Sequence, residues 1–142
     1  MIDARQRMAL LGDWPAGHKP GAMAAPIDRR AIGLAAEDRA ARHLAWRGWR
    51  VVARNWYGGG GELDIVASRW RTLLVVEVRS RADDRALASI DKDKLERTIR
   101  AARALVRQYG LQAYRLRIDL IGFDARGRLR RQADVLRWLG LS

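Results

Sequence analysis

Residues 62–79, which read ELDIVASRWRTLLVVEVR, contain two strand-like segments joined by a short turn. Residues 62–67 alternate acidic with apolar side chains before they become wholly apolar, and residues 72–79 are apolar on both faces until the segment ends. An apolar run of that length is typical of a central strand that is covered on both sides. With residues 68–71 as the turn, this stretch predicts an antiparallel hairpin in the middle of a sheet.

The same hairpin brings two carboxylates together. If residues 70–71 form the turn, Arg69 pairs with Thr72, and counting back along both strands places Asp64 directly opposite Glu77. Cross-strand neighbours have Cβ atoms about 4.5–5.5 Å apart, and two negative charges at that distance destabilise a sheet. A divalent cation removes the conflict, because Mg²⁺ binds carboxylate, phosphate and water oxygens. Asp64 and Glu77 are therefore predicted to be metal ligands.

Such a site suits the hydrolysis of a phosphodiester bond. A bound metal ion neutralises charge on the scissile phosphate and lowers the pKa of a water molecule, so that hydroxide can attack. Arg79 lies on the same strand face as the second carboxylate, and we expect it to orient that water or to stabilise the transition state. Strand alternation also predicts that Glu62 and Asp64 share one face. Leu63 and Ile65 are then expected on the other face.

Upstream of the hairpin, the sequence predicts a helix, a short strand and a loop. Asp28 is a plausible N-cap for the helix and Gly48 a plausible stop. Four residues share one helical face through the spacing i, i+4, i+7 and i+11: Gly33, Glu37, Ala40 and Leu44. Residues 49–53 form the short strand. Residues 55–61, with four consecutive glycines at 58–61, are predicted to be a mobile flap over the site.

Downstream of the hairpin, residues 89–109 are predicted to form a second helix and residues 114–123 a further strand. Arg117 and Asp119 point to one face of that strand and are expected to form a structural ion pair. Residues 129–138 form a last strand or a short helix. The order helix, three strands, helix, strand predicts an α/β fold with a mixed central sheet flanked by helices.

The charge of the chain indicates a polyanionic partner. Lys and Arg number 28 against 16 Asp and Glu, which gives a net charge of +12. An excess of this size is typical of proteins that contact nucleic acid, although a GC-rich genome also enriches Arg over Lys. Arg100, Arg103 and Arg107 fall on one side of the second helix, where they would either follow a phosphate backbone or form a solvated basic face.

The composition also limits the class and location of the protein. Cysteine is absent, which excludes disulfides and thiolate metal sites. No apolar run approaches the roughly 18 residues of a membrane helix, and the N-terminus lacks a secretory signal, so we expect a cytoplasmic protein without membrane contact. Residues 1–27 contain Gly and Pro without periodicity and are expected to be a flexible arm. Residues 28–142 then form one nuclease-like domain.

Several motifs together resemble the bacterial UPF0102 (YraN-like) family in order and spacing. They are Gly33-Leu-Ala-Ala-Glu37, Asn55, Gly61-Glu-Leu-Asp-Ile-Val-Ala67, Val75-Val-Glu-Val-Arg-Ser-Arg81, Lys94 and Arg117-Ile-Asp-Leu-Ile121. The resemblance covers residues 29 to about 138. That family is similar to the restriction-endonuclease superfamily, and most of all to archaeal Holliday-junction resolvases. The resemblance implies an αβββαβ core.

The resemblance also implies roles for individual residues. Asp64 and Glu77 would bind Mg²⁺ or Mn²⁺, and Glu37 would be a third, helix-borne acid beside the metal. The alternative for Glu37 is a hydrogen bond to Arg39 or Arg54 at the edge of the core. Arg79 stands where the superfamily usually has lysine, and Arg is hard to deprotonate, so its role would be electrostatic. The residues expected to line the site or contact nucleic acid are Asn55, Trp56, Glu62, Arg81, Lys94 and Arg100.

Three functions remain in competition at this point. The leading one is a metal-dependent endonuclease acting on DNA, including branched or single-stranded forms, with a homodimer as one way to make paired cuts. The second is a catalytically degenerate nucleic-acid-binding module with the same fold. The third is an adaptor whose acidic pocket only stabilises the fold. Trp56 and Trp70 flank the predicted site and would stack on unpaired bases, with packing as the alternative for each.

Overall fold

The computed structural model describes residues 27–79 and 91–140. Its elements are α2 (Ile27–Trp46), β1 (Arg50–Gly58), β2 (Gly61–Arg69), β3 (Thr72–Arg79), α4 (Lys92–Tyr109), β4 (Arg115–Phe123), β5 (Leu129–Gln132) and α5 (Val135–Trp138). Residues 1–26 of the expected arm lie outside the described residues, and so does Arg81. The order of elements confirms the predicted α/β fold. No helix in the described ranges is long and apolar enough to cross a membrane.

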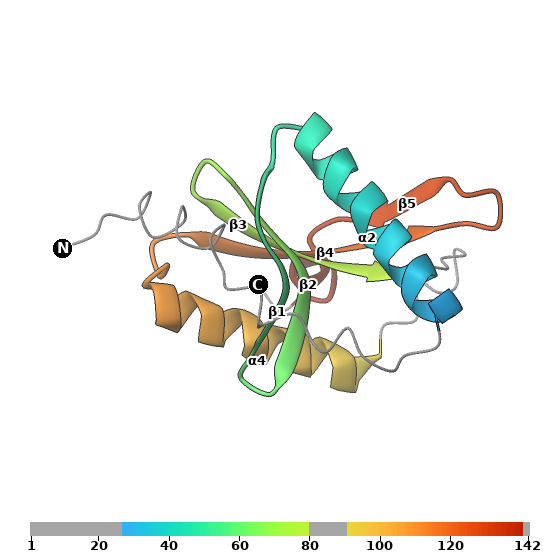
Figure 1. Ribbon diagram of the computed structural model, residues 1–142. Coiled ribbons are helices and arrows are strands. Elements are labelled where there is room, and N and C mark those ends of the chain that lie inside the picture. Colours follow the sequence, from blue (N-terminus) through green and yellow to red (C-terminus); the bar gives the residue numbers. More distant parts are fainter. Residues whose placement is uncertain (1–26, 80–90, 141–142) are drawn as a thin grey trace.

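One mixed sheet organises the molecule. Its five strands lie in the order β1-β2-β3-β4-β5. β3 and β4 are parallel, and the other neighbours are antiparallel. Helix α4 makes the crossover between the two parallel strands, as a parallel connection requires. The arrangement is consistent with a restriction-endonuclease-like αβββαβ core, and α2 and α4 lie on opposite sides of the sheet (Figure 1).

Each face of the sheet has its own hydrophobic cluster. On one face α2 buries Ala36, Ala40 and Leu44 against apolar strand residues, which include Ile65, Ala67, Leu74, Val76 and Ile121. On the other face α4 buries Ala101, Ala102 and Leu105 against a second set, which includes Val52, Trp56, Leu63, Val66, Leu73 and Val75. Because the middles of β2 and β3 are covered on both sides, residues 65–67 and 73–76 are wholly apolar.

The glycine-rich segment is a tight turn, so the prediction of a mobile flap over residues 55–61 is wrong. β1 continues to Gly58, which pairs with Gly61, and only two residues form the turn. Gly59 and Gly60 have φ of 59° and 83°, a conformation that glycine adopts without strain. A Cβ on Gly61 would lie 2.5 Å from the carbonyl oxygen of Arg97. The glycines therefore let the β1–β2 hairpin approach the backbone of α4.

The central hairpin has the predicted register over most of its length. Arg69 pairs with Thr72, and the pairing continues to Ile65 and Val76. The two strands are not paired beyond Ile65 and Val76, so the expected pair of Asp64 and Glu77, which would come next, does not form. β2 and β3 therefore part at the level where the sequence placed the two carboxylates.

Strands β1 and β2 depart from regular alternation at the same level. Trp56 and Leu63 are paired and pack on the α4 side, whereas Ile65 packs on the α2 side. The expectation that Leu63 and Ile65 share a face is therefore wrong. Between the paired positions lie Asn55, which has a φ of 51°, and Asp64. This irregularity turns the side chain of Asp64 toward the gap between β2 and β3.

The helix ends differ slightly from prediction. α2 begins at Ile27, so Asp28 lies inside the helix and is not its N-cap. α4 begins at Lys92, and its N-cap is Asp91, whose side chain accepts hydrogen bonds from the backbone N–H groups of Asp93 and Lys94. An N-cap of this kind satisfies donors that the first helical turn leaves free. It also fixes Lys94 in the first turn of α4, close to the sheet.

Candidate active site

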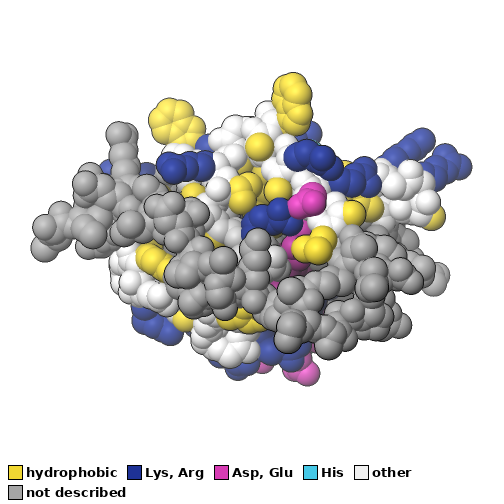
Figure 2. Space-filling view, in the orientation of Figure 1, with side chains coloured by type: hydrophobic (Ala, Val, Ile, Leu, Met, Phe, Trp, Pro, Cys, Tyr) yellow, Lys and Arg dark blue, Asp and Glu magenta, His cyan; other side chains and the backbone are white. Residues whose placement is uncertain are grey.

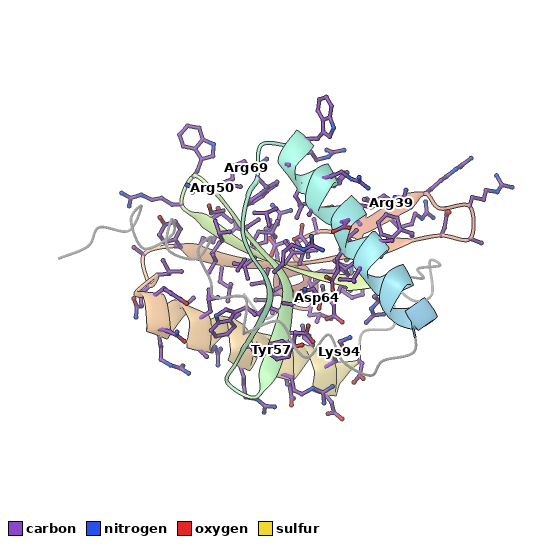
Figure 3. All side chains as sticks on the ribbon, viewed as in Figure 1. Arg39, Arg50, Tyr57, Asp64, Arg69 and Lys94 are labelled. Carbon is purple, nitrogen blue, oxygen red and sulfur yellow. The ribbon has the colours of Figure 1, made fainter. Side chains whose placement is uncertain are left out.

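A pocket of about 200 Å³ opens where β2 and β3 part. It is lined by β2, β3 and the first half of α4, through Glu62, Leu63, Asp64, Val75, Val76, Glu77, Lys94, Arg97 and Thr98. Four of the sequence-predicted site residues are thus brought together: Glu62, Asp64, Glu77 and Lys94. Figure 3 shows Asp64 on the sheet with Lys94 and Tyr57 near it in that view.

Asp64 is the acid most strongly affected by its surroundings. Burial raises its pKa to about 7, because removal from water penalises the charged form. The negative charges of Glu62, Glu37 and Glu77 raise the pKa further. A hydrogen bond from the Val78 backbone N–H to Asp64 Oδ2, at 2.9 Å, acts in the opposite direction. The pocket therefore holds a carboxylate that gains from a nearby positive charge.

Glu77 is buried in the same pocket and has a lysine beside it. It is 7% exposed, and Lys94 Nζ lies 2.7 Å from Glu77 Oε1. The contact is an ion pair without favourable hydrogen-bond geometry, because Oε1 has no hydrogen-bond partner. The side chain of Lys94 is about half exposed, so its ammonium group can also reach solvent or a ligand.

Tyr57 is a site neighbour that the sequence analysis missed. It pairs with Glu62 across the β1–β2 hairpin, and its phenol donates a hydrogen bond to that carboxylate. Burial, the hydrogen bond and nearby carboxylates raise the pKa of the phenol. The residue was overlooked because it was assigned to the glycine-rich loop. Recognition of Gly59-Gly60 as a hairpin turn would have placed Tyr57 opposite Glu62.

Glu37 does not join the pocket. Its Oε2 accepts hydrogen bonds from Asn55 Nδ2 at 3.2 Å and from Arg54 Nη2 at 3.4 Å. Burial raises the pKa of Glu37, while Asn55 and Arg54 lower it. Among residues 27–79 and 91–140, no three His, Cys, Asp or Glu side chains are grouped to hold a metal ion. The predicted trio of Glu37, Asp64 and Glu77 is therefore not assembled, and Glu37 accepts hydrogen bonds from Asn55 and Arg54 instead.

Two further predicted residues lie outside the pocket lining. Arg79 is at the end of β3, half-buried and level with Gly122 of β4. Arg100 is exposed on α4, one turn beyond Arg97. Arg97 and Thr98 were missed by the sequence analysis and do line the pocket. Their positions follow from the packing of α4 on the β1–β2 hairpin, for which the local sequence gives no signal.

The tryptophans correct another expectation. Trp56 is 1% exposed and packs in the core between the sheet and α4, so it is not available to stack on a base. Trp70 is exposed, but it sits in the β2–β3 turn, at the opposite end of the hairpin from Asp64. A strand rises about 3.3 Å per residue, so roughly 20 Å of β2 separates the two. Trp70 does not flank the pocket.

The donors of the pocket fit a hard divalent cation. Asp64 and Glu77 present carboxylate oxygens, and Glu77 Oε1 is a buried acceptor without a hydrogen bond. Mg²⁺ in proteins is commonly bound by one or two carboxylates, with phosphate and water oxygens completing its shell. A third protein carboxylate is not required for that chemistry.

Comparisons with known proteins agree with the motifs. Residues 36–123, more than half of the chain, match the uncharacterised protein family UPF0102. A UPF0102 protein of Chloroflexus aurantiacus is 38% identical over 103 residues, which cover 72% of this chain and 86% of the relative. One from Paracidovorax citrulli is 48% identical over 91 residues, 59% of this chain and 67% of the relative. One from Myxococcus xanthus is 38% identical over 107 residues, 73% of this chain and 85% of the relative. With this match and with αβββαβ topology around the Asp64–Glu77 pocket, the chain belongs to the UPF0102 family.

Proposed function

We propose that this chain is a metal-dependent endonuclease that hydrolyses phosphodiester bonds in DNA, with the pocket between β2, β3 and α4 as its active site. The observation that carries the proposal is the meeting of Asp64, Glu77 and Lys94 in one pocket. Two carboxylates largely shielded from water beside a half-exposed cation are groups that a phosphodiesterase can use. The restriction-endonuclease-like topology is compatible with this activity but does not require it.

Asp64 and Glu77 are the residues that would hold Mg²⁺ or Mn²⁺. When bound, the metal supplies activation of water and neutralisation of phosphate charge. Asp64 must lose its proton to act as a ligand, and its pKa of about 7 makes that loss possible at neutral pH. Glu77 already has a positive charge 2.7 Å away in Lys94 Nζ, so this carboxylate is arranged for a cationic neighbour.

The cations of α4 would bind the substrate phosphate. Lys94 and Arg97 line the pocket from the same helix, one turn apart. Lys94 can exchange Glu77 for a phosphate oxygen, since half of its side chain is exposed. Glu62, held by Tyr57, contributes negative charge that favours a cation in the pocket. Arg79 would act only through its charge, from the end of β3.

The test is cleavage of labelled four-way-junction, flap and single-stranded DNA by the full chain with Mn²⁺, Mg²⁺ or EDTA. We expect metal-dependent cleavage by the wild type and a loss of at least about 100-fold in Asp64→Asn and Glu77→Gln. Glu96→Gln, which changes an exposed carboxylate on α4 outside the pocket lining, is the matched control and should cut like the wild type. Cleavage that persists equally in Asp64→Asn and Glu77→Gln would show that another site does the chemistry.

A nucleic-acid-binding module without turnover is the second candidate. Its support is specific: Arg79 replaces the expected lysine, and Lys94 contacts Glu77 at the position where a metal would bind. Under this alternative, DNA binding falls with rising salt and survives both Asp64→Asn and Glu77→Gln, and no metal ion produces cleavage. Light scattering of the protein with and without DNA would show whether a homodimer forms in either case.

A further inference from the structure

Two tryptophans project into solvent at the end of the molecule that lies away from the pocket. Trp46 in the last turn of α2 is 90% exposed, and Trp70 in the β2–β3 turn is 92% exposed. Both turns meet at Arg69, whose Nη1 donates a 2.8 Å hydrogen bond to the carbonyl oxygen of Arg47. Figure 2 shows two bulky hydrophobic side chains projecting from this edge, with Lys or Arg side chains beside them.

The surroundings of these tryptophans are rich in arginine. Five exposed arginines lie in the same turns or beside them: Arg42, Arg47, Arg50, Arg69 and Arg71. Figure 3 labels Arg50 and Arg69 at this edge. Residues 42–50 and 66–72, which contain these tryptophans and arginines, include no Asp or Glu. We call Trp46, Trp70 and these five arginines the Trp/Arg edge.

Arg69 links the turns of the Trp/Arg edge to the core. The Arg69 guanidinium stacks on the ring of buried Trp49, with 4.2 Å from Cζ to the ring centroid. Arg117 approaches the same ring at 5.7 Å. The two turns that carry the exposed rings are therefore tied together through Arg69, which reduces the backbone entropy lost when a ligand binds.

Trp70 is also an unfavourable residue for the fold. Its φ is 55°, a left-handed conformation that a bulky side chain adopts only with strain, and its ring gains no burial. Glycine or asparagine would suit this turn position better. Strained residues of this kind occur where function, not folding, selects the side chain.

We infer that the Trp/Arg edge is a binding surface for single-stranded DNA, separate from the pocket. Bases stack on exposed aromatic rings, and arginines neutralise the phosphates between them. The inference rests on the proposed function in one respect, because it names the single-stranded part of the nuclease substrate. Binding itself does not require the pocket to be catalytic.

A membrane surface fits the Trp/Arg edge less well. Proteins that lie on a bilayer bury a continuous apolar face of a helix. Here the two tryptophans stand on separate turns with arginines between and beside them, and the exposed end of α2 offers no continuous apolar face. Separate exposed rings with cations beside them can instead contact bases and phosphates.

The experiment is fluorescence anisotropy in EDTA, with a labelled single-stranded oligodeoxynucleotide and the corresponding duplex, using the full chain. We expect Trp46→Ala and Trp70→Ala each to raise the Kd for the single strand by about fivefold or more. The Kd for the duplex should change by less than about twofold, since its bases are already stacked. Trp70→Phe, which keeps a ring, should retain most of the affinity. Trp138→Ala, an exposed tryptophan on α5, is the matched control and should bind like the wild type.

Unchanged single-strand affinity in the folded double variant Trp46→Ala/Trp70→Ala would overturn the inference. The inference would also be overturned if the double variant kept its affinity for single-stranded DNA but no longer co-sedimented with phosphatidylserine vesicles. The Trp/Arg edge would then be a membrane-binding surface. EDTA prevents metal-dependent cleavage, so the two proposals fail separately. If the wild type binds single-stranded DNA but never cleaves it, and the double variant does not bind, the nuclease proposal is refuted and the Trp/Arg edge is supported.

Discussion

Asp64 couples the stability of the protein to pH. Its pKa rises from 3.8 to about 7 on folding, chiefly through burial. Between these two values the folded state binds more protons than the unfolded state, so the free energy of unfolding falls as pH rises through this window. Above a pH of about 7 the free energy of unfolding no longer falls. The pKa shift of Asp64 limits the total loss of unfolding free energy to roughly 4 kcal/mol.

We therefore expect Asp64→Asn to be more stable than the wild type at about pH 8 without metal, and to match it at about pH 4. Asparagine can keep the hydrogen bond from Val78 N–H and carries no charge to bury. Urea denaturation at several pH values measures the difference. Asp93→Asn, on the exposed first turn of α4, should keep the wild-type pH dependence. Identical pH profiles for Asp64→Asn and the wild type would contradict the burial of a titrating carboxyl group.

Metal binding should offset the cost of burying the charged Asp64 carboxylate. At about pH 8, a concentration of Mg²⁺ or Mn²⁺ near 100 times its Kd should stabilise the wild type by about 2.7 kcal/mol, because only the folded state holds the site. EDTA should remove the gain, and Asp64→Asn should show none of it. The shift in Tm on adding metal is the measurement. An equal shift in Asp64→Asn would place the metal elsewhere.

Lys94 should matter to cleavage much more than to stability. The lysine is half exposed, so the Glu77–Lys94 ion pair contributes at most about 1 kcal/mol. Removal of its charge from the pocket should nevertheless lower kcat/KM for Mn²⁺-dependent cleavage by about tenfold or more. Lys94→Gln is the test, and Lys92→Gln, an exposed lysine outside the pocket lining, is its control. Equal kcat/KM values for the two variants would remove Lys94 from the mechanism.

At the scale of elements, the β1–β2 hairpin positions α4 and hence the cations of the pocket. Gly61→Ala would place a Cβ 2.5 Å from the carbonyl oxygen of Arg97, and should destabilise the fold by about 1–3 kcal/mol and reduce cleavage. Gly60→Ala meets no atom within 4 Å and only the strain of φ 83°, about 1 kcal/mol. The Tm and the cleavage rate of Gly61→Ala and Gly60→Ala are the measurements. Equal effects on cleavage would mean that hairpin–helix packing does not position the site.

A second element-scale contact joins β4, β5 and the start of α5. Asp119 is 0% exposed. It accepts a bidentate pair of hydrogen bonds from Arg117, two from Arg131 at Oδ2, and one from the Asp134 backbone N–H. The predicted Arg117–Asp119 pair is thus confirmed. Asp119→Ala leaves two partly buried cations without their acid and should cost about 3 kcal/mol in urea denaturation. Asp124→Ala, in the turn between β4 and β5, should cost far less, and similar losses would argue against a buried network.

At the scale of the whole molecule, the acidic pocket and the Trp/Arg edge occupy opposite ends of the β2–β3 hairpin. Their separation of roughly 20 Å corresponds to about six base pairs of duplex. A splayed-arm substrate with its single strand on the Trp/Arg edge should therefore be cut in the duplex at a constant distance, about six base pairs from the junction. Gel mapping of the products measures this distance. Cuts at positions unrelated to the junction would mean that the Trp/Arg edge and the pocket do not bind the same substrate molecule together.

The sequence alone determined the order of elements, the hairpin register from Arg69 and Thr72 inward, and the two carboxylates at its open end. These features depend on periodicity and turn length, which are local properties of the chain. The glycine-rich turn was the local feature that was misread. Two positive-φ glycines also close a hairpin, and the choice between a hairpin and a loop was settled by packing against α4.

Only the tertiary structure decided which groups meet in the pocket. Lys94, Arg97 and Thr98 reach it because α4 packs on the sheet from far along the chain. Glu37 does not line the pocket, and accepts hydrogen bonds from Asn55 and Arg54 instead. The raised pKa of Asp64 and the burial of Trp56 likewise require the assembled core, since desolvation depends on every neighbour that excludes water. Long-range packing, which no local pattern encodes, therefore sets the chemistry of the site.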